Sequence, residues 1–195
     1  MGDFDSFLHY LKQEKQILRI SVLGDGAVGK TTLIQSIINS VDDGDSKQET
    51  SRTPFMEIET WIHDGISIQA YDLAGQRTEG AHPVDLLPDQ IFGHIDIILL
   101  VFSLHRYESF SNLDTWMQLI AKQIETSDNG MPNFLLIGNK SDKEQRIDDS
   151  LIESVVSSNQ GISKFLKTSA QNGAGIDQLI SEISSLAQTI IPGEN

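Results

Sequence analysis

Apolar and polar positions divide the chain into six expected strands. Continuous apolar runs, typical of strands covered on both faces, occupy residues 17–24, 94–103 and 133–140. Two further strands flank the turn at residues 63–65, because its Asp-Gly pair is a strong hairpin signal. A sixth strand is expected immediately before Thr168.

Helical patterns separate most of these strands. Apolar residues recur at spacings of three and four within residues 113–120, 151–156 and 176–186, and residues 30–39 also indicate a helix. Trp116 and Met117 belong to the first of these patterns, and we expect them in the core. The polar segment 41–53 is expected to be a loop. This alternation predicts an α/β fold with a mostly parallel six-stranded sheet, one antiparallel strand, and helices on both faces.

Charge and composition narrow the possible partners. The chain has 195 residues, a formal net charge of −14 and no cysteine. A nucleic-acid partner requires Lys and Arg to replace counterions on phosphates, so we expect none. The missing cysteines argue against a disulfide framework and against prenylation. No apolar run approaches the roughly 20 residues of a membrane span, and no secretory signal is expected, so we predict a cytoplasmic location. We also expect a monomer.

The stretch GDGAVGKTT between the first strand and helix predicts a phosphate-binding loop. Gly26 and Gly29 allow the backbone to wrap closely, so that N–H groups point at phosphate oxygens. Lys30 supplies a charge for the β- and γ-phosphates, and Thr31 offers a hydroxyl to Mg²⁺. The expected phosphate-binding residues are Gly26, Ala27, Val28, Gly29, Lys30, Thr31 and Thr32.

The stretch GNKSD, at the end of a buried strand, indicates that the base is guanine. The carboxylate of Asp142 can accept from guanine N1–H and from the N2 amine, whereas adenine would leave it unpaired. We expect Asn139 to bind the N7/O6 side and the stem of Lys140 to cover the ring. The later stretch TSA is expected to place the backbone of Ser169 and Ala170 near O6.

The stretch DLAGQ ends the second hairpin strand and carries the expected hydrolytic residue. Asp72 would hold Mg²⁺ through a water, and the Gly75 amide would bind the γ-phosphate. Gln76 is placed to orient the attacking water. A threonine that meets Mg²⁺ only with the triphosphate is Thr53 or Thr50, and we favour Thr53 because it directly precedes a strand.

Together these motifs resemble the Ras superfamily of small GTPases, over residues 17–190. GDGAVGKT, DLAGQ, GNKSD and TSA are similar to Ras or Rab members, while TPFMEIETWIHDGISIQAYDLAGQ is similar to the corresponding part of Arf proteins. The interval of about 19 positions between Thr53 and Asp72 also resembles Arf. A divergent Arf-like member is therefore expected, with an amphipathic helix in residues 1–16 and a P-loop GTPase domain in residues 17–195.

The resemblance implies a cycle between GDP and GTP, with Mg²⁺, an exchange factor, a GTPase-activating protein and effectors. Hydrolysis would be slow without the activating protein, because the sequence offers no obvious internal arginine finger. The alternatives are a cytosolic Ras- or Rab-like switch with a static N-terminal helix, and an adaptor that binds but does not hydrolyse guanine nucleotide. An ATPase is a weaker third reading.

The N-terminal segment has three readings. Phe4, Phe7, Leu8 and Leu11 lie at helical spacing. In the first, the helix packs permanently on the domain. In the second, it leaves the domain on GTP binding and makes weak, reversible membrane contact through residues 3–15. In the third, the segment docks on another protein or remains unfolded. Gly2 fits an acylation pattern, but the acidic Asp3 disfavours acylation. A peripheral membrane location in the GTP state is the favoured expectation.

Overall fold

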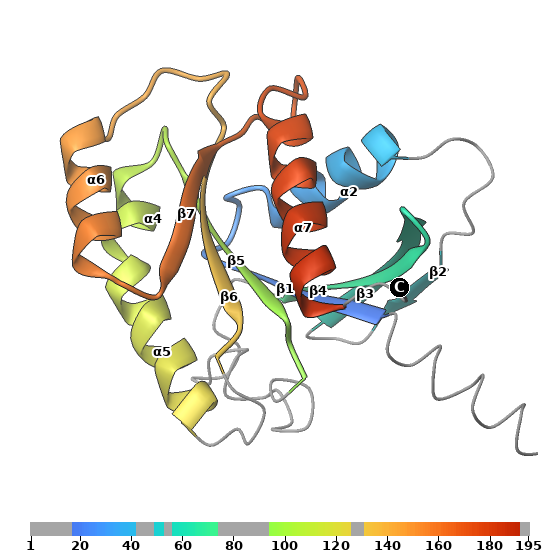
Figure 1. Cartoon of the computed structure of the whole chain (residues 1–195). Helices are drawn as coiled ribbons and strands as arrows, with labels where there is room; N and C mark the ends of the chain where they lie inside the picture. The colour runs from blue at the N-terminus through green and yellow to red at the C-terminus, as the bar shows by residue number, and fades with distance from the viewer. Residues whose placement is uncertain (1–16, 42–48, 53–55, 74–93, 126–130, 192–195) are drawn as a thin grey trace, which may run out of the picture.

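A computed structural model describes residues 17–41, 49–52, 56–73, 94–125 and 131–191. The predicted N-terminal helix of residues 1–16 lies outside these ranges, as do Thr53, Gly75 and Gln76. The described residues form a central sheet between two layers of helices (Figure 1).

The sheet has the strand order β2-β3-β4-β1-β5-β6-β7. Its strands are β1 (Ile17–Leu23), β2 (Glu49–Arg52), β3 (Met56–His63), β4 (Ile66–Leu73), β5 (Ile97–Ser103), β6 (Asn133–Asn139) and β7 (Ile162–Lys167). Strand β3 pairs antiparallel with both β2 and β4, and the remaining pairs are parallel. The six strands expected from the sequence are all present, and β3 is the one antiparallel strand.

Strand β2 was not expected, because residues 41–53 were predicted to be a loop. Its residues ETSR include no apolar side chain, so no hydrophobic alternation marks them. The strand instead results from backbone pairing along the edge of β3, where Thr50 lies opposite Glu59 and Arg52 opposite Glu57. The loop prediction was therefore wrong for residues 49–52.

Five helices cover the described sheet. They are α2 (Lys30–Val41), α4 (Tyr107–Ser111), α5 (Leu113–Glu125), α6 (Asp149–Ser158) and α7 (Ile176–Ile190). Helices α2 and α7 lie on one face, and α4, α5 and α6 lie on the other (Figure 1). The short α4 has no counterpart in the prediction, since five residues are too few for a helical period to emerge.

Alternate residues of the buried central strands serve two separate cores. In β5, Ile97, Leu99 and Val101 pack toward α2 and α7. Ile98, Leu100 and Phe102 pack toward α4, α5 and α6. All seven residues of β5 are buried, which explains why its sequence is a continuous apolar run.

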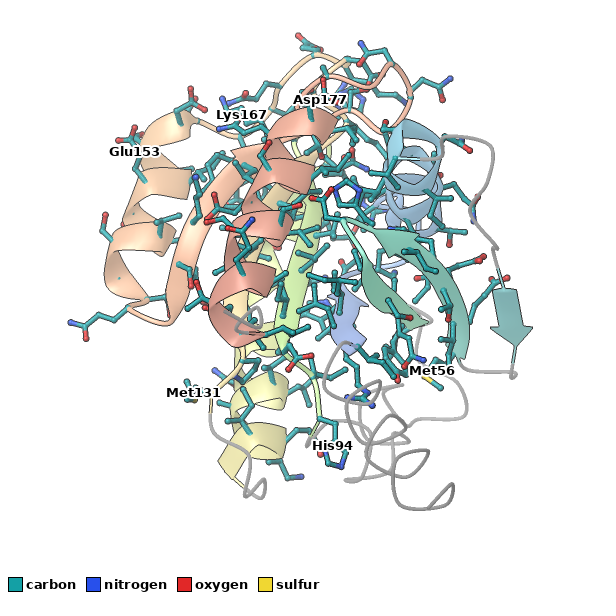
Figure 2. All side chains as sticks on the ribbon, turned by 45° about the vertical axis from the view of Figure 1, so that its right-hand side comes forward. Met56, His94, Met131, Glu153, Lys167 and Asp177 are labelled. Carbon is teal, nitrogen blue, oxygen red and sulfur yellow. The ribbon has the colours of Figure 1, made fainter. Side chains whose placement is uncertain are left out.

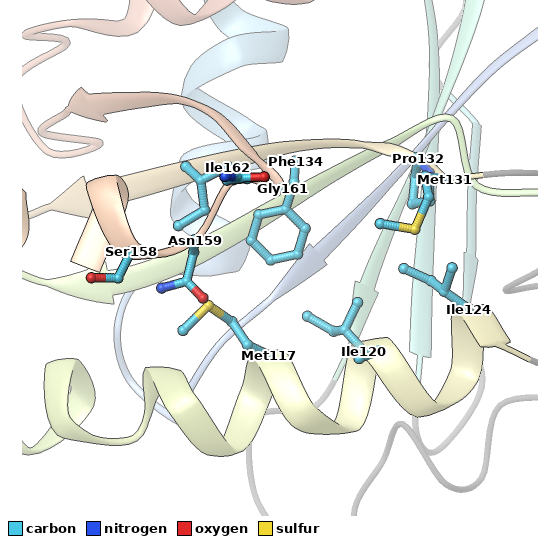
Figure 3. Close-up of a pocket in the computed structure, with 12 residues that line it drawn as sticks. Met117, Ile120, Ile124, Met131, Pro132, Phe134, Ser158, Asn159, Gly161 and Ile162 are labelled. Carbon is cyan, nitrogen blue, oxygen red and sulfur yellow. The ribbon is translucent and has the colours of Figure 1, made fainter. Parts of the chain in front are cut away.

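The two ends of the parallel strands have different surroundings. Lys167, at the end of β7, and His94, just before β5, lie at opposite ends of the molecule (Figure 2). A cavity of about 410 Å³ lies at the His94 end, between α5 and the start of β6, lined by apolar residues such as Met117, Ile120 and Phe134 (Figure 3). The predicted nucleotide motifs all follow the carboxyl ends of strands, where ligands bind in open α/β sheets. The cavity is therefore separate from the candidate site.

Candidate nucleotide site

The predicted phosphate loop joins the end of β1 to the start of α2. Its backbone adopts positive φ at Gly24 (136°), Ala27 (61°) and Gly29 (100°). A Cβ on Gly24 would lie 2.0 Å from the carbonyl oxygen of Val101 in β5, so only glycine fits there. Gly24 is the first glycine of the predicted loop motif, but its constraint comes from a strand far along the chain and was not predictable from the motif.

Every backbone carbonyl from Gly24 to Gly29 accepts a hydrogen bond from elsewhere in the protein. The donors are Lys30 Nζ to Gly24 (2.9 Å) and to Asp25 (3.0 Å), Arg106 Nη2 to Gly26 (2.7 Å), Lys140 Nζ to Ala27 (2.5 Å), Asn139 Nδ2 to Val28 (3.0 Å) and the Leu33 amide to Gly29 (2.8 Å). We call this set the carbonyl clasp. These bonds fix the backbone of the loop, whose N–H groups are the expected donors to phosphate.

The candidate metal residues Thr31 and Asp72 lie together. The Thr31 hydroxyl donates to Asp72 Oδ2, and Thr31 is exposed while Asp72 is buried at the end of β4. Hydroxyl and carboxylate oxygens are the ligands that Mg²⁺ prefers, so these two residues fit the ion.

Burial sets the electrostatics of the phosphate and metal residues. It raises the pKa of Asp72 above its usual 3.8, against the Thr31 hydrogen bond and the Lys30 charge, and the carboxylates of Glu57 and Glu59 add to the increase. Burial also lowers the pKa of Lys30 below 10.5, although Asp72 acts in the opposite direction. A buried carboxylate beside a buried ammonium suits a site that takes a divalent cation together with a polyanion.

The guanine motif is tied to the phosphate loop by its own side chains. Asn139 is buried and donates one amide hydrogen to Val28, so its second amide hydrogen remains for a base. Lys140 has a positive φ of 65° and reaches across to Ala27. The exposed Asp142 accepts a 2.5 Å hydrogen bond from the Ser169 hydroxyl, which holds the pKa of that carboxyl below 3.8.

The TSA segment lies beside this motif, but its amides already have partners. The Ala170 amide donates to Asn139 Oδ1 (3.1 Å), and the Ser169 amide donates to the Ala174 carbonyl (2.8 Å). The Thr168 hydroxyl also donates to Asn139 Oδ1, at 3.2 Å. A bound base would therefore share or displace the Ala170 bond if that amide is to reach O6.

A group of residues that no sequence motif predicted holds the outer side of the phosphate loop. Asp25 accepts from Asn112 Nδ2 (2.7 Å) and from the Trp116 indole N–H (2.9 Å), so its carboxylate is bound to α5 and the turn before it. Trp116 is buried in the core, as predicted, yet its N–H also has this second role. No local motif indicates these contacts, because 87 and 91 positions separate the partners along the chain.

Three predicted site residues cannot be placed. Thr53, Gly75 and Gln76 lie outside the described residues. Thr50, the other candidate switch threonine, is in β2, which is separated from β4 by β3. Thr32 is exposed in the first turn of α2.

This geometry agrees with a comparison against known protein families. The Ras family matches residues 19–189, and the chain belongs to that family. It is a GTPase that binds GTP, GDP and Mg²⁺.

The relatives carry Rab names. Ras-related protein Rab-7a of Paramecium octaurelia is 29% identical over 178 residues, which cover 90% of this chain and 83% of that protein. The Ypt/Rab-type GTPase avaA of Emericella nidulans is 29% identical over 181 residues, covering 90% and 85%. Ras-related protein RABG3d of Arabidopsis thaliana is 27% identical over 169 residues, covering 85% and 79%. These names support a Ras or Rab switch and give no support to the Arf-like resemblance.

Within the described part of the chain, none of the helices combines the length and the apolar character that crossing a bilayer requires.

Proposed function

We propose that this chain is a Rab-type switch in membrane traffic, with a cytoplasmic form and a form that is peripheral at a membrane. The proposal rests on the Rab names of its relatives and on the carbonyl clasp, which fixes the backbone of the predicted phosphate loop. Exchange factors, activating proteins and effectors are its expected partners, and the GTPase domain comprises residues 17–195.

In this proposal each predicted residue has one task. Lys30 and the loop amides of residues 26–31 hold the phosphates, and Thr31 and Asp72 hold Mg²⁺, which neutralises phosphate charge when bound. Asp142 and Asn139 select guanine. Thr53 and Gly75 respond to the γ-phosphate, and Gln76 orients the attacking water.

Single-turnover hydrolysis tests the catalytic assignment. Wild type should convert bound GTP to GDP slowly, and Gln76→Leu should be slower still, because leucine cannot hydrogen-bond to the water. Gln178→Leu is the matched control, because it makes the same change at an exposed position on α7. If wild type and Gln76→Leu turn over at the same rate, the role given to Gln76 is wrong, and if both are inert, the chain acts as a non-hydrolysing adaptor.

A second candidate function concerns residues 3–15. The interval of about 19 positions between Thr53 and Asp72 resembles that of Arf proteins, and this resemblance implies an N-terminal helix that leaves the domain on GTP binding and contacts a membrane. Liposome flotation of the full chain and of residues 16–195, with GDP and with a slowly hydrolysed GTP analogue, tests this mechanism. Equal flotation of the full chain in both nucleotide states would contradict it and favour a static helix.

A further inference from the structure

Arg106 stands out within the carbonyl clasp. The other side-chain donors, Lys30, Asn139 and Lys140, belong to sequence motifs already assigned to nucleotide binding. Arg106 comes from the turn between β5 and α4, outside every such motif, and it holds Gly26 through a 2.7 Å bond from Nη2. Within the clasp, Arg106 is the donor to the Gly26 carbonyl.

The Arg106 guanidinium also has unused donor capacity. Its Nε–H is buried and has no hydrogen-bond partner among the described residues. Buried donors are nearly always satisfied in folded proteins, so this unsatisfied Nε–H is an exception that calls for an explanation. Arginine presents its donors in a rigid fork that matches phosphate oxygens.

The charge of Arg106 lies near Lys30 of the phosphate loop and Lys140 of the guanine motif. Burial lowers the pKa of both lysines most, and Arg106 lowers each further, less than Lys143 does at Lys140 and against the larger opposing effects of Asp72 and Asp25 at Lys30. Three cations therefore surround one short loop. Their mutual repulsion is relieved when an anion binds between them, and the β- and γ-phosphates reached by Lys30 are such an anion.

We propose that Arg106 is an additional cation of the phosphate site, which positions Gly26 from the outer side of the loop and strengthens the hold on nucleotide phosphates. The inference rests on the proposed function only in taking residues 24–31 as the phosphate loop. It gives the chain an internal arginine at the loop, which the sequence analysis did not anticipate. Arg106 acts here on binding and loop geometry.

The test measures release of fluorescent GDP and of a fluorescent GTP analogue from the full chain in Mg²⁺. Arg106→Ala should accelerate release by about tenfold or more, the effect of losing a charge-assisted hydrogen bond. Arg106→Lys, which keeps the charge, should stay within about threefold of wild type, whereas Arg106→Gln, which keeps a neutral donor, should resemble Arg106→Ala. Arg146→Ala is the matched control, because Arg146 is exposed and its nearest carboxylate, Glu144, is 3.9 Å away.

Release rates that are the same for Arg106→Ala and Arg146→Ala would overturn the proposal. If Arg106→Ala does not fold, the comparison of Arg106→Lys with Arg106→Gln decides, and equal rates for those two variants would also overturn it. Failure of the proposed function has a different signature, because wild type would then retain no guanine nucleotide at all.

Discussion

At the scale of single residues, the environment of Asp142 shows how a side chain is prepared for a ligand. The carboxylate is exposed for a base, yet the Ser169 hydroxyl fixes its orientation and keeps it ionised by lowering its pKa. Its acceptor character is therefore maintained at any pH well above 3.8. Guanine, with two donors on one edge, is the complementary base.

Asp142→Asn should reverse this preference. The amide introduces a donor where guanine also presents donors, so GTP binding should weaken by roughly tenfold or more. Xanthine nucleotide, which carries an oxygen in place of the N2 amine, should bind more tightly, because the introduced amide can donate to that oxygen. Competition of GTP, XTP and ATP for one fluorescent nucleotide measures the change. An unchanged GTP-to-XTP ratio would contradict the assignment.

Asp96 provides a pH test away from the nucleotide. Its carboxylate accepts from the Arg19 amide (2.7 Å), but burial raises its pKa above 3.8, against that hydrogen bond. The folded state thus binds the proton more tightly than the unfolded chain. The free energy of unfolding contributed by Asp96 should decrease as pH rises from 3.8 through the raised pKa.

Asp96→Asn should therefore flatten this part of the stability profile and raise stability at neutral pH, because the amide oxygen can still accept from Arg19. Urea unfolding across the acidic range measures the effect. Glu153→Gln, at an exposed position on α6, is the matched control and should leave the slope in place. If both substitutions change the slope equally, burial of Asp96 is not the cause.

At the scale of elements, the sequence predicted what local patterns can encode. The continuous apolar runs gave β1, β5 and β6, and the Asp-Gly pair gave the β3–β4 hairpin. The motifs at strand ends assigned Lys30, Asn139 and Lys140 to one nucleotide site, and the structure shows in addition that all three side chains bond to the phosphate loop. The contact of Arg106 with Gly26 was not predictable, because it depends on β5 lying beside β1 in the sheet.

The same neighbourhood makes Gly24 sensitive to substitution. Gly24→Ala would place a Cβ 2.0 Å from the Val101 carbonyl, at a φ of 136°. The clash lies against backbone of a buried strand, so we expect loss of the folded protein or a destabilisation of more than about 4 kcal/mol. Gly65→Ala has a φ of 76° but open space around the Cβ, so it should cost only about 1–2 kcal/mol. Circular dichroism melts of both variants test this difference, and equal losses would contradict it.

Over the whole molecule, the net charge of −14 dominates the long-range electrostatics. Like charges repel one another in the compact state, and salt screens them, with a Debye length of about 30 Å at 0.01 M and about 10 Å at 0.1 M. The unfolding midpoint should therefore rise between these concentrations of NaCl. Glu153→Lys, which removes part of the excess negative charge, should reduce that rise. A midpoint that does not respond to salt would show that the charges are too dispersed to matter.

The bonds of Asn139 have a consequence for how the nucleotide leaves. One side chain joins the Val28 carbonyl of the phosphate loop to the Ala170 amide of the guanine segment. The phosphate loop and the guanine segment are therefore connected through Asn139, so a change that displaces one of them should also weaken binding at the other. Guanosine and pyrophosphate, offered as separate fragments, should each bind weakly, and their two binding free energies should add up to less than that of GDP. A partner that promotes exchange needs to pull on only one end of the nucleotide.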